Sequence, residues 1–283
     1  MGVLKCVFVI IGAIIGAGFA SGKEIYTFFF VYGEKGIIGI IISFLLIGYI
    51  IFKSLKIIKI YEINNYDEFL KIIINKKIFR KLNFEIIINF IINIFLLVTF
   101  FIMCAGFSAY FNQEFGINQT ITGVIVAIVS YIILNKNSKG IFIINSILIP
   151  LIILILIILG TKSYNIPVNY IKISNTSEWF LKSILYASYN SVTLISILIP
   201  MRKYIKDKKD IFKITILSII ITIIMAQVII MLLLSVKSDI SNIDLPAVYA
   251  SRIIWRYIQI FIWYNYFRCN YYYRNLCWIW ILK

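Results

Sequence analysis

The sequence contains no histidine, and acidic residues are scarce: 12 Asp and Glu stand against 28 Lys and Arg among 283 residues. The lack of histidine excludes imidazole general-base catalysis and histidine metal ligation. The four cysteines form no pair of Cys-x-x-Cys motifs, which excludes a zinc-finger-like ligand set. No nucleophile and base stand in a recognisable catalytic pattern, so we expect neither an enzyme nor a cofactor.

Hydrophobic residues, by contrast, are abundant. They make up 61% of the chain, and the mean hydropathy is +0.95. Several continuous apolar runs of about 20 residues are long enough to cross the hydrocarbon core of a bilayer. The runs do not alternate as the strands of a membrane barrel would. The sequence therefore predicts an all-α polytopic membrane protein with the lipid bilayer as its main surroundings.

Eight apolar runs are predicted to span the membrane. The N-terminal run resembles a signal peptide, but the apolar pattern resumes at Ile25 and continues, so a first membrane helix is the simpler interpretation. The predicted spans are about 4–32, 36–56, 85–111, 118–135, 140–161, 178–200, 210–236 and 247 onward.

The net charge of +16 predicts membrane orientation rather than a nucleic-acid partner. Fifteen basic residues lie in one alternate set of loops, and four lie in the other set. Basic loops face the cytoplasm, which predicts a multi-pass protein of the cell inner membrane with a cytoplasmic N-terminus. The fifteen are Lys53, Lys56, Lys59, Lys71, Lys76, Lys77, Arg80, Lys81, Lys136, Lys139, Arg202, Lys203, Lys206, Lys208 and Lys209.

The 53–84 loop contains the pattern "YDEFLKIIINKKIFRKL". Two interpretations fit this pattern equally well. It can form a short amphipathic basic helix on the inner leaflet, or it can be an ordinary cytoplasmic connector.

The first span is unusual in carrying four glycines at its centre, in the stretch "IIGAIIGAGFASGKEIYTFFF". Glycine lowers helix stability by about 1 kcal/mol relative to alanine, so a break near Gly12–Gly18 is plausible. Backbone groups freed by a break can bind Na⁺ or a carboxylate. The alternative is close helix packing through small-xxx-small patterns. Lys23 and Glu24 follow, and we expect them to act at an aqueous vestibule or a gate.

The sixth span carries polar residues at its centre, where neighbouring residues are Ile and Leu. Two interrupted helices in corresponding positions of two halves are a pointer to a transporter site. The alternative is interhelical hydrogen bonding. We expect this stretch to contact a solute, and its residues are Tyr186, Ser188, Tyr189, Asn190 and Ser191.

These motifs carry a resemblance that covers roughly residues 4–260. The stretch "IGAIIGAGFASGKEIYTFF", with "LYASYNSV" and "MCAGFSAYF" in support, resembles the YkvI-like family of uncharacterised bacterial membrane proteins. That family is similar to the amino acid–polyamine–organocation transporters, whose LeuT-like fold has two inverted five-helix repeats. The resemblance implies interrupted first and sixth helices, an ion at carbonyls near Gly12 and Ile15, and a solute near Ala17, Gly18 and Tyr186 to Ser191.

The last 23 residues depart in composition from the rest, since three of the five tryptophans lie there. An aromatic belt at a membrane interface is one interpretation. We prefer a frameshift, so that 1–260 form a transporter-like domain and 261–283 an aberrant continuation of the eighth span. The chain is then C-terminally truncated relative to the ten helices that the resemblance implies, and is not expected to transport.

The functional hypothesis is a secondary transporter for a small solute, an amino acid or related zwitterion, driven by Na⁺ or H⁺. The alternatives are a membrane receptor subunit that senses a solute and a non-functional truncated product. The solute, the coupling ion and the oligomeric state are not determined by the sequence.

Overall fold

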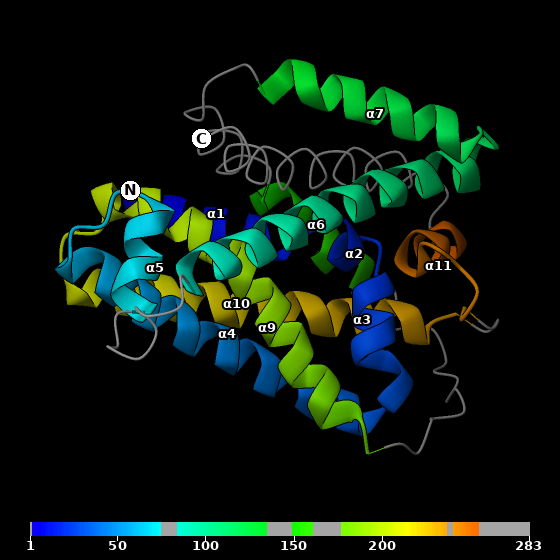
Figure 1. Ribbon diagram of the computed structural model, residues 1–283. Helices are drawn as coiled ribbons and strands as arrows, with labels where there is room; N and C mark the ends of the chain where they lie inside the picture. Colours follow the sequence, from blue (N-terminus) through cyan, green and yellow to red (C-terminus); the bar gives the residue numbers. More distant parts are fainter. Residues whose placement is uncertain (1, 75–83, 135–148, 161–176, 237–239, 255–283) are drawn as a thin grey trace.

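The computed structural model describes residues 2–74, 84–134, 149–160, 177–236 and 240–254 (Figure 1). The described residues are helical and contain no strand, as the apolar runs predict. The predicted tail at 261–283 lies outside the described residues. The basic residues Lys76, Lys77, Arg80, Lys81, Lys136 and Lys139 also lie outside them.

Four long helices meet the length and hydropathy needed to cross a membrane. They are α4 (Glu34–Ile60), the greater part of α6 (Phe84–Phe115), α9 (Trp179–Leu198) with the 3₁₀ helix η3 (Ile199–Tyr204), and α10 (Lys208–Leu234). Shorter apolar helices are α1 (Gly2–Ile14), α7 (Gln119–Leu134) and Ile149–Gly160. The chain is thus a membrane protein whose regular structure, over the residues described, is helical.

The centre of the molecule is built by α1, α4, α9 and α10. The helix α4 packs along both α9 and α10, and α1 lies against α9 and α10 (Figure 1). From Cys6 to Ile15 only Phe8 is not fully buried, which is typical of a helix enclosed on all sides. The helix α6 instead exposes large apolar side chains such as Phe90, Phe101 and Ile102, as a lipid-facing helix does.

The first span is broken, as its glycines predict. The helix α1 ends at Ile14, and a new helical turn, α2 (Ala17–Ala20), begins after Ile15 and Gly16. A second interruption at Ser21 and Gly22 separates α2 from α3 (Lys23–Phe28), and η1 (Phe30–Tyr32) ends the span. The long predicted run at 4–32 is therefore four short pieces rather than one tilted helix.

The predicted interruption of the sixth span is wrong. The helix α9 runs without a break from Trp179 to Leu198. Its polar side chains bond to carbonyls one turn earlier in the same helix: Ser183 to Trp179, Asn190 to Tyr186 and Ser191 to Ala187, at 2.7, 3.0 and 2.6 Å. Polar residues that satisfy themselves in this way need no gap in the helix.

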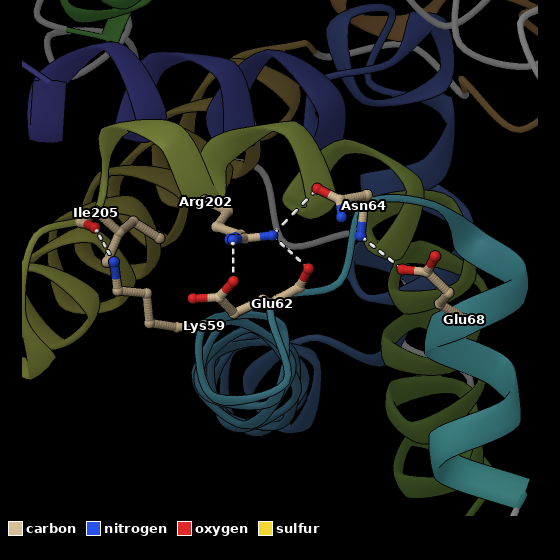
Figure 2. Close-up of polar contacts among 6 residues, drawn as sticks. All are labelled: Lys59, Glu62, Asn64, Glu68, Arg202 and Ile205. Carbon is tan, nitrogen blue, oxygen red and sulfur yellow. Dashed lines mark hydrogen bonds and ion pairs between the residues drawn. The ribbon is translucent and has the colours of Figure 1, made fainter.

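The two basic segments after α4 and after α9 contact each other (Figure 2). Arg202 of η3 forms an ion pair with Glu62, at 2.9 Å, in the turn after α4. Lys59 donates to the carbonyl of Ile205 at 2.8 Å. The prediction that the 53–84 and 202–209 loops share one side of the membrane therefore agrees with these contacts.

The pattern in the 53–84 loop forms the helix α5 (Tyr66–Ile74). Its first turn is capped from within, because Asn65 accepts from the amide of Glu68 while Glu68 accepts from the amide of Asn64, both at 2.9 Å. Tyr66 and Phe69 are buried. Burial, with the nearby Asp67 carboxylate, raises the pKa of Tyr66 to about 12, so Tyr66 stays uncharged even in alkaline solution in which a free tyrosine ionises.

Candidate functional site

The break between α1 and α2 is the centre of the candidate site. The last regular hydrogen bond of α1 joins the amide of Ile15 to the carbonyl of Ile11, at 2.8 Å. The amide of Gly16 then turns to the carbonyl of Ile14, at 2.9 Å, and α2 restarts with the amide of Ala20 bonded to the Gly16 carbonyl. The ladder of hydrogen bonds is interrupted for about one turn.

The interruption leaves carbonyls of the first span without a backbone donor. Among the described residues, no backbone amide donates to the carbonyl of Gly12 or Ile15. Both residues are buried, and the side chain of Ile15 is fully enclosed. Of the two residues predicted to present carbonyls to an ion, Gly12 lies in the last turn of α1 and Ile15 lies in the break, both inside the helical core.

The second interruption, after α2, is held against the start of α11 (Pro246–Ile254). Gly22 has a positive φ of 77°, and a Cβ there would lie 2.8 Å from the Cβ of Ala247. A left-handed backbone in such close contact favours glycine. The amide of Ala247 donates to the carbonyl of Ser21 at 2.7 Å, so the elbow between α2 and α3 is tied to α11.

Lys23 strengthens the same attachment. Its ammonium group donates to the carbonyl of Ile243 at 2.8 Å and to that of Ser241 at 3.4 Å. These carbonyls belong to the segment that leads into α11, 218 and 220 residues away in the chain. Lys23 therefore clamps two distant segments, which is a position suited to the gating role predicted for it.

Glu24, unlike Lys23, contacts the helix α9. The hydroxyl of Tyr189 donates to Oε2 of Glu24 at 2.6 Å. The other carboxylate oxygen, Oε1, lies against Gly18, where it would meet any Cβ built on that residue. Gly18, Glu24 and Tyr189, three residues of the predicted site, are thus brought together by contacts that connect α2, α3 and α9.

An aromatic cluster adjoins this carboxylate. The ring of Tyr186 lies 4.9 Å from Phe29, 5.4 Å from Phe28 and 5.8 Å from Phe44, centroid to centroid. Tyr189 lies 5.3 Å from Tyr186 and 5.8 Å from Phe28. Tyr186 is completely buried. The predicted solute-binding tyrosines therefore pack with phenylalanines of α3, α4 and the turn after α3.

The other predicted residues of α9 separate onto different sides of the helix. Asn190 and Ser191 are buried, whereas Ser188 is exposed and bonds to the carbonyl of Ile184 at 2.8 Å. Ala17 lies in the first turn of α2 beside the break. The structure thus groups Gly18, Glu24, Tyr186 and Tyr189, and it places Ser188 apart from them.

Two features of the site are absent from the sequence predictions. The first is the phenylalanine set, although the spacing of Phe28 four residues after Glu24 places both on one face of a helix. The second is a contact between α4 and α9, where Ser43 donates to the carbonyls of Gly39 and Ser183 at 2.8 and 2.9 Å. No local pattern relates Ser43 to Ser183, which is 140 residues away.

Comparison with known proteins adds one relative. The chain is 29% identical over 217 residues to the "Uncharacterized membrane protein YkvI" of Bacillus subtilis (strain 168). The chain resembles YkvI. The matched region is 73% of this chain and 59% of the relative, so the chain spans less than two thirds of the length of that relative. No family model matches the chain, and no solved structure does.

The resemblance predicted from the glycine-rich motif is confirmed by this match. The likeness to the LeuT-like fold stays a prediction. Because the relative is itself uncharacterised, its name assigns no function, and the geometry of the site is the better guide to what the chain binds.

Proposed function

We propose that the protein is a secondary transporter for a small solute, an amino acid or a related zwitterion, coupled to Na⁺ or H⁺. The observation that carries the proposal is the break of α1 at Ile15 and Gly16 inside the helical core. No covalent chemistry and no cofactor are part of the proposal.

The break is costly unless something binds there. A buried carbonyl without a donor carries a penalty of about 1–3 kcal/mol. Non-helical backbone at membrane depth is tolerated where it lines a binding cavity or is enclosed by protein. Carbonyl oxygens of an unwound segment can coordinate coupling ions such as Na⁺. The carbonyls of Gly12 and Ile15 are the groups that we assign to such an ion.

The solute is assigned to the adjoining residues. Gly18 lies at the end of the break, and the tyrosines Tyr186 and Tyr189 approach the same region from α9. The proposal includes the inverted-repeat architecture of the transporters that the motifs resemble. In that arrangement α1 to α3 and α9 face each other across the site, as their contacts support.

The proposal also includes the orientation of the chain, with the N-terminus in the cytoplasm. Single cysteines at Lys71 and Asn242, both exposed, test it in a background without the native cysteines. Lys71 lies in α5 and Asn242 in the segment before α11, and these two helices lie near opposite ends of the bundle (Figure 1). We expect an impermeant thiol reagent to label the cysteine at 242 from outside and the cysteine at 71 only after the membrane is opened.

Uptake into proteoliposomes tests transport directly. The chain and the longer Bacillus subtilis relative are reconstituted in parallel and offered radiolabelled L-amino acids under an inward Na⁺ gradient or an inward proton gradient. We expect gradient-dependent uptake by the relative and saturable binding by the chain. Absence of both binding and uptake across the panel would contradict the proposal. Binding by the chain, with binding but no uptake by the relative, would favour a sensor.

A further inference from the structure

Glu24 is a carboxylate inside the first span whose charge no basic side chain balances among the described residues. Among the described residues the one ion pair joins Arg202 of η3 to Glu62 in the turn after α4, and neither belongs to the first span. Glu24 instead accepts a hydrogen bond from the neutral hydroxyl of Tyr189. An ionisable residue within a membrane span is costly, and such residues mark functional sites when no structural partner neutralises them.

The neighbouring lysine does not serve as that partner. Lys23 directs its ammonium group to the carbonyls of Ile243 and Ser241, at 2.8 and 3.4 Å. Consecutive residues of a helix point in directions about 100° apart, so the two side chains diverge. The charge of Lys23 is used to attach α3 to the segment before α11, and the charge of Glu24 remains available on the side of α9.

The surroundings of Glu24 suit a positively charged ligand. Phe28 lies one turn after Glu24 on α3, and its ring lies 5.8 Å from the ring of Tyr189. Both side chains are only partly buried. Aromatic faces attract an ammonium group, and a carboxylate beside them binds it more tightly than either does alone.

We infer that Glu24, Tyr189 and Phe28 bind the amine of the transported solute, with the carboxylate of Glu24 as its counter-charge. The inference rests on the proposed function and narrows the solute to one that carries a primary or quaternary ammonium group. Tyr189 orients the carboxylate from one side through its hydroxyl. Gly18, which has no side chain, allows the other carboxylate oxygen to approach the end of the break.

Small amines test the inference without knowledge of the solute. The purified chain in lipid nanodiscs is heated with propylammonium chloride or tetramethylammonium chloride, and with sodium propionate and 1-propanol as probes that lack the positive charge. Ionic strength is matched with NaCl. We expect a saturable rise of the melting temperature with the two cations only, because a ligand that binds the folded state stabilises it by mass action.

Variants locate the effect. We expect Glu24→Gln to weaken the response to both cations roughly 10-fold or more, since a hydrogen-bonded charge partner is lost. Glu178→Gln is the matched control, because Glu178 is an exposed glutamate at the start of α9. It is expected to respond as the wild type does. An unchanged response of Glu24→Gln would overturn the inference, as would a wild-type protein that no cation stabilises.

Two further variants keep the charge and so guard against a simple folding defect. In Gly18→Ala the new methyl group must displace the flexible carboxylate of Glu24 rather than any backbone atom. In Tyr189→Phe the orienting hydroxyl is removed. We expect each to weaken the response to the cations several-fold at an unchanged melting temperature of the unliganded protein. Full cation responses in both variants would contradict the assigned geometry.

Failure of this inference and failure of the proposed function give different results. A cation response lost in Glu24→Gln, together with no uptake of any solute by the relative, would leave an amine site and remove the transport proposal. Solute binding that persists at full affinity in Glu24→Gln, together with uptake by the relative, would leave transport and remove the amine site. Binding of an amine-free analogue to the chain at the same affinity would also remove the amine site.

Discussion

The first span and α9 lie against each other in the core, and both place small or polar residues at mid-helix. Only the first span is interrupted there, and α9 is not. The first span opens at Ile15 and Gly16, whereas α9 continues through Asn190 and Ser191. Glycine offers no side chain with which to satisfy a neighbouring carbonyl. Serine and asparagine do, and each uses the carbonyl one turn earlier.

The difference between the two spans shows that polarity alone does not loosen a membrane helix. The helix α10 supports this, because Ser218 and Thr222 bond to the carbonyls of Ile214 and Ser218, at 2.8 and 2.9 Å, without interrupting it. A break forms where no side chain of the helix bonds to its carbonyls and where neighbouring elements pack against the non-helical segment. In the first span those flanking elements are α9, α10 and the start of α11.

The largest effect is expected from closing the break. Gly16→Leu introduces a strong helix former and a bulky side chain at a buried position. We expect the affinity for the solute found in the uptake panel to fall roughly 10- to 100-fold, because overpacking a core position costs about 1–3 kcal/mol. Equilibrium binding measures it. The matched control is Ser188→Leu on the exposed side of α9, which is expected to bind normally.

Equal affinities in Gly16→Leu and Ser188→Leu would mean that the break is not part of the site. The first span would then be open for packing reasons alone.

A smaller effect is expected where α9 is pressed against α4. A Cβ on Gly39 would lie 2.5 Å from the hydroxyl oxygen of Ser183. We expect Gly39→Ala to lower the free energy of unfolding by about 1 kcal/mol, because the Ser183 hydroxyl must turn away and give up its hydrogen bond to the carbonyl of Trp179. Denaturation in mixed micelles measures the loss. Ile38→Ala, at an exposed position of the same helix, is the control, and equal losses would show that close packing does not hold α9.

The hydrogen bonds that side chains of α9 make to carbonyls of the same helix are expected to contribute less to the free energy of unfolding. Asn190→Ala removes one hydrogen bond within the helix, and side-chain hydrogen bonds between membrane helices, which serve as the guide here, average about 0.6 kcal/mol. We expect the free energy of unfolding to fall by roughly that amount, with helix content unchanged by circular dichroism. A loss of helix content would mean that α9 depends on the Asn190 side chain for its continuity, whereas we expect the backbone ladder to hold without it.

The smallest effect is expected at the far end of α9. Arg202→Ala removes the ion pair with Glu62, whose side chain is 76% exposed. Exposed pairs contribute about 0–1 kcal/mol and are screened by salt. We expect the loss of stability at low salt to exceed the loss at high salt by an amount within that range, because salt screens the ion pair but not the hydrogen bonds from Arg202 to the carbonyl of Glu62 and to Asn64. Lys203→Ala, next to it and exposed, is the control, and a loss that does not depend on salt would show that the ion pair itself contributes nothing.

Much of the helical structure could be predicted from the sequence, because a long apolar run indicates a membrane helix without any information about its neighbours. The break in the first span follows from the glycines in the same way. The continuity of α9 does not, since it depends on where Asn190 and Ser191 direct their hydrogen bonds. The pairing of Glu24 with Tyr189 is likewise hidden, because 165 residues separate them and no periodicity connects them.

The contacts of Lys23 have a consequence for how the protein is made. Its acceptor, the carbonyl of Ile243, is synthesised 220 residues later. At about 5–20 residues per second, the ribosome needs roughly 11 to 44 seconds to reach it. Lys23 enters the membrane with the first span but finds its final acceptor only after most of the described chain has been made. The elbow after α2 therefore cannot reach its final attachment until the segment before α11 is in place.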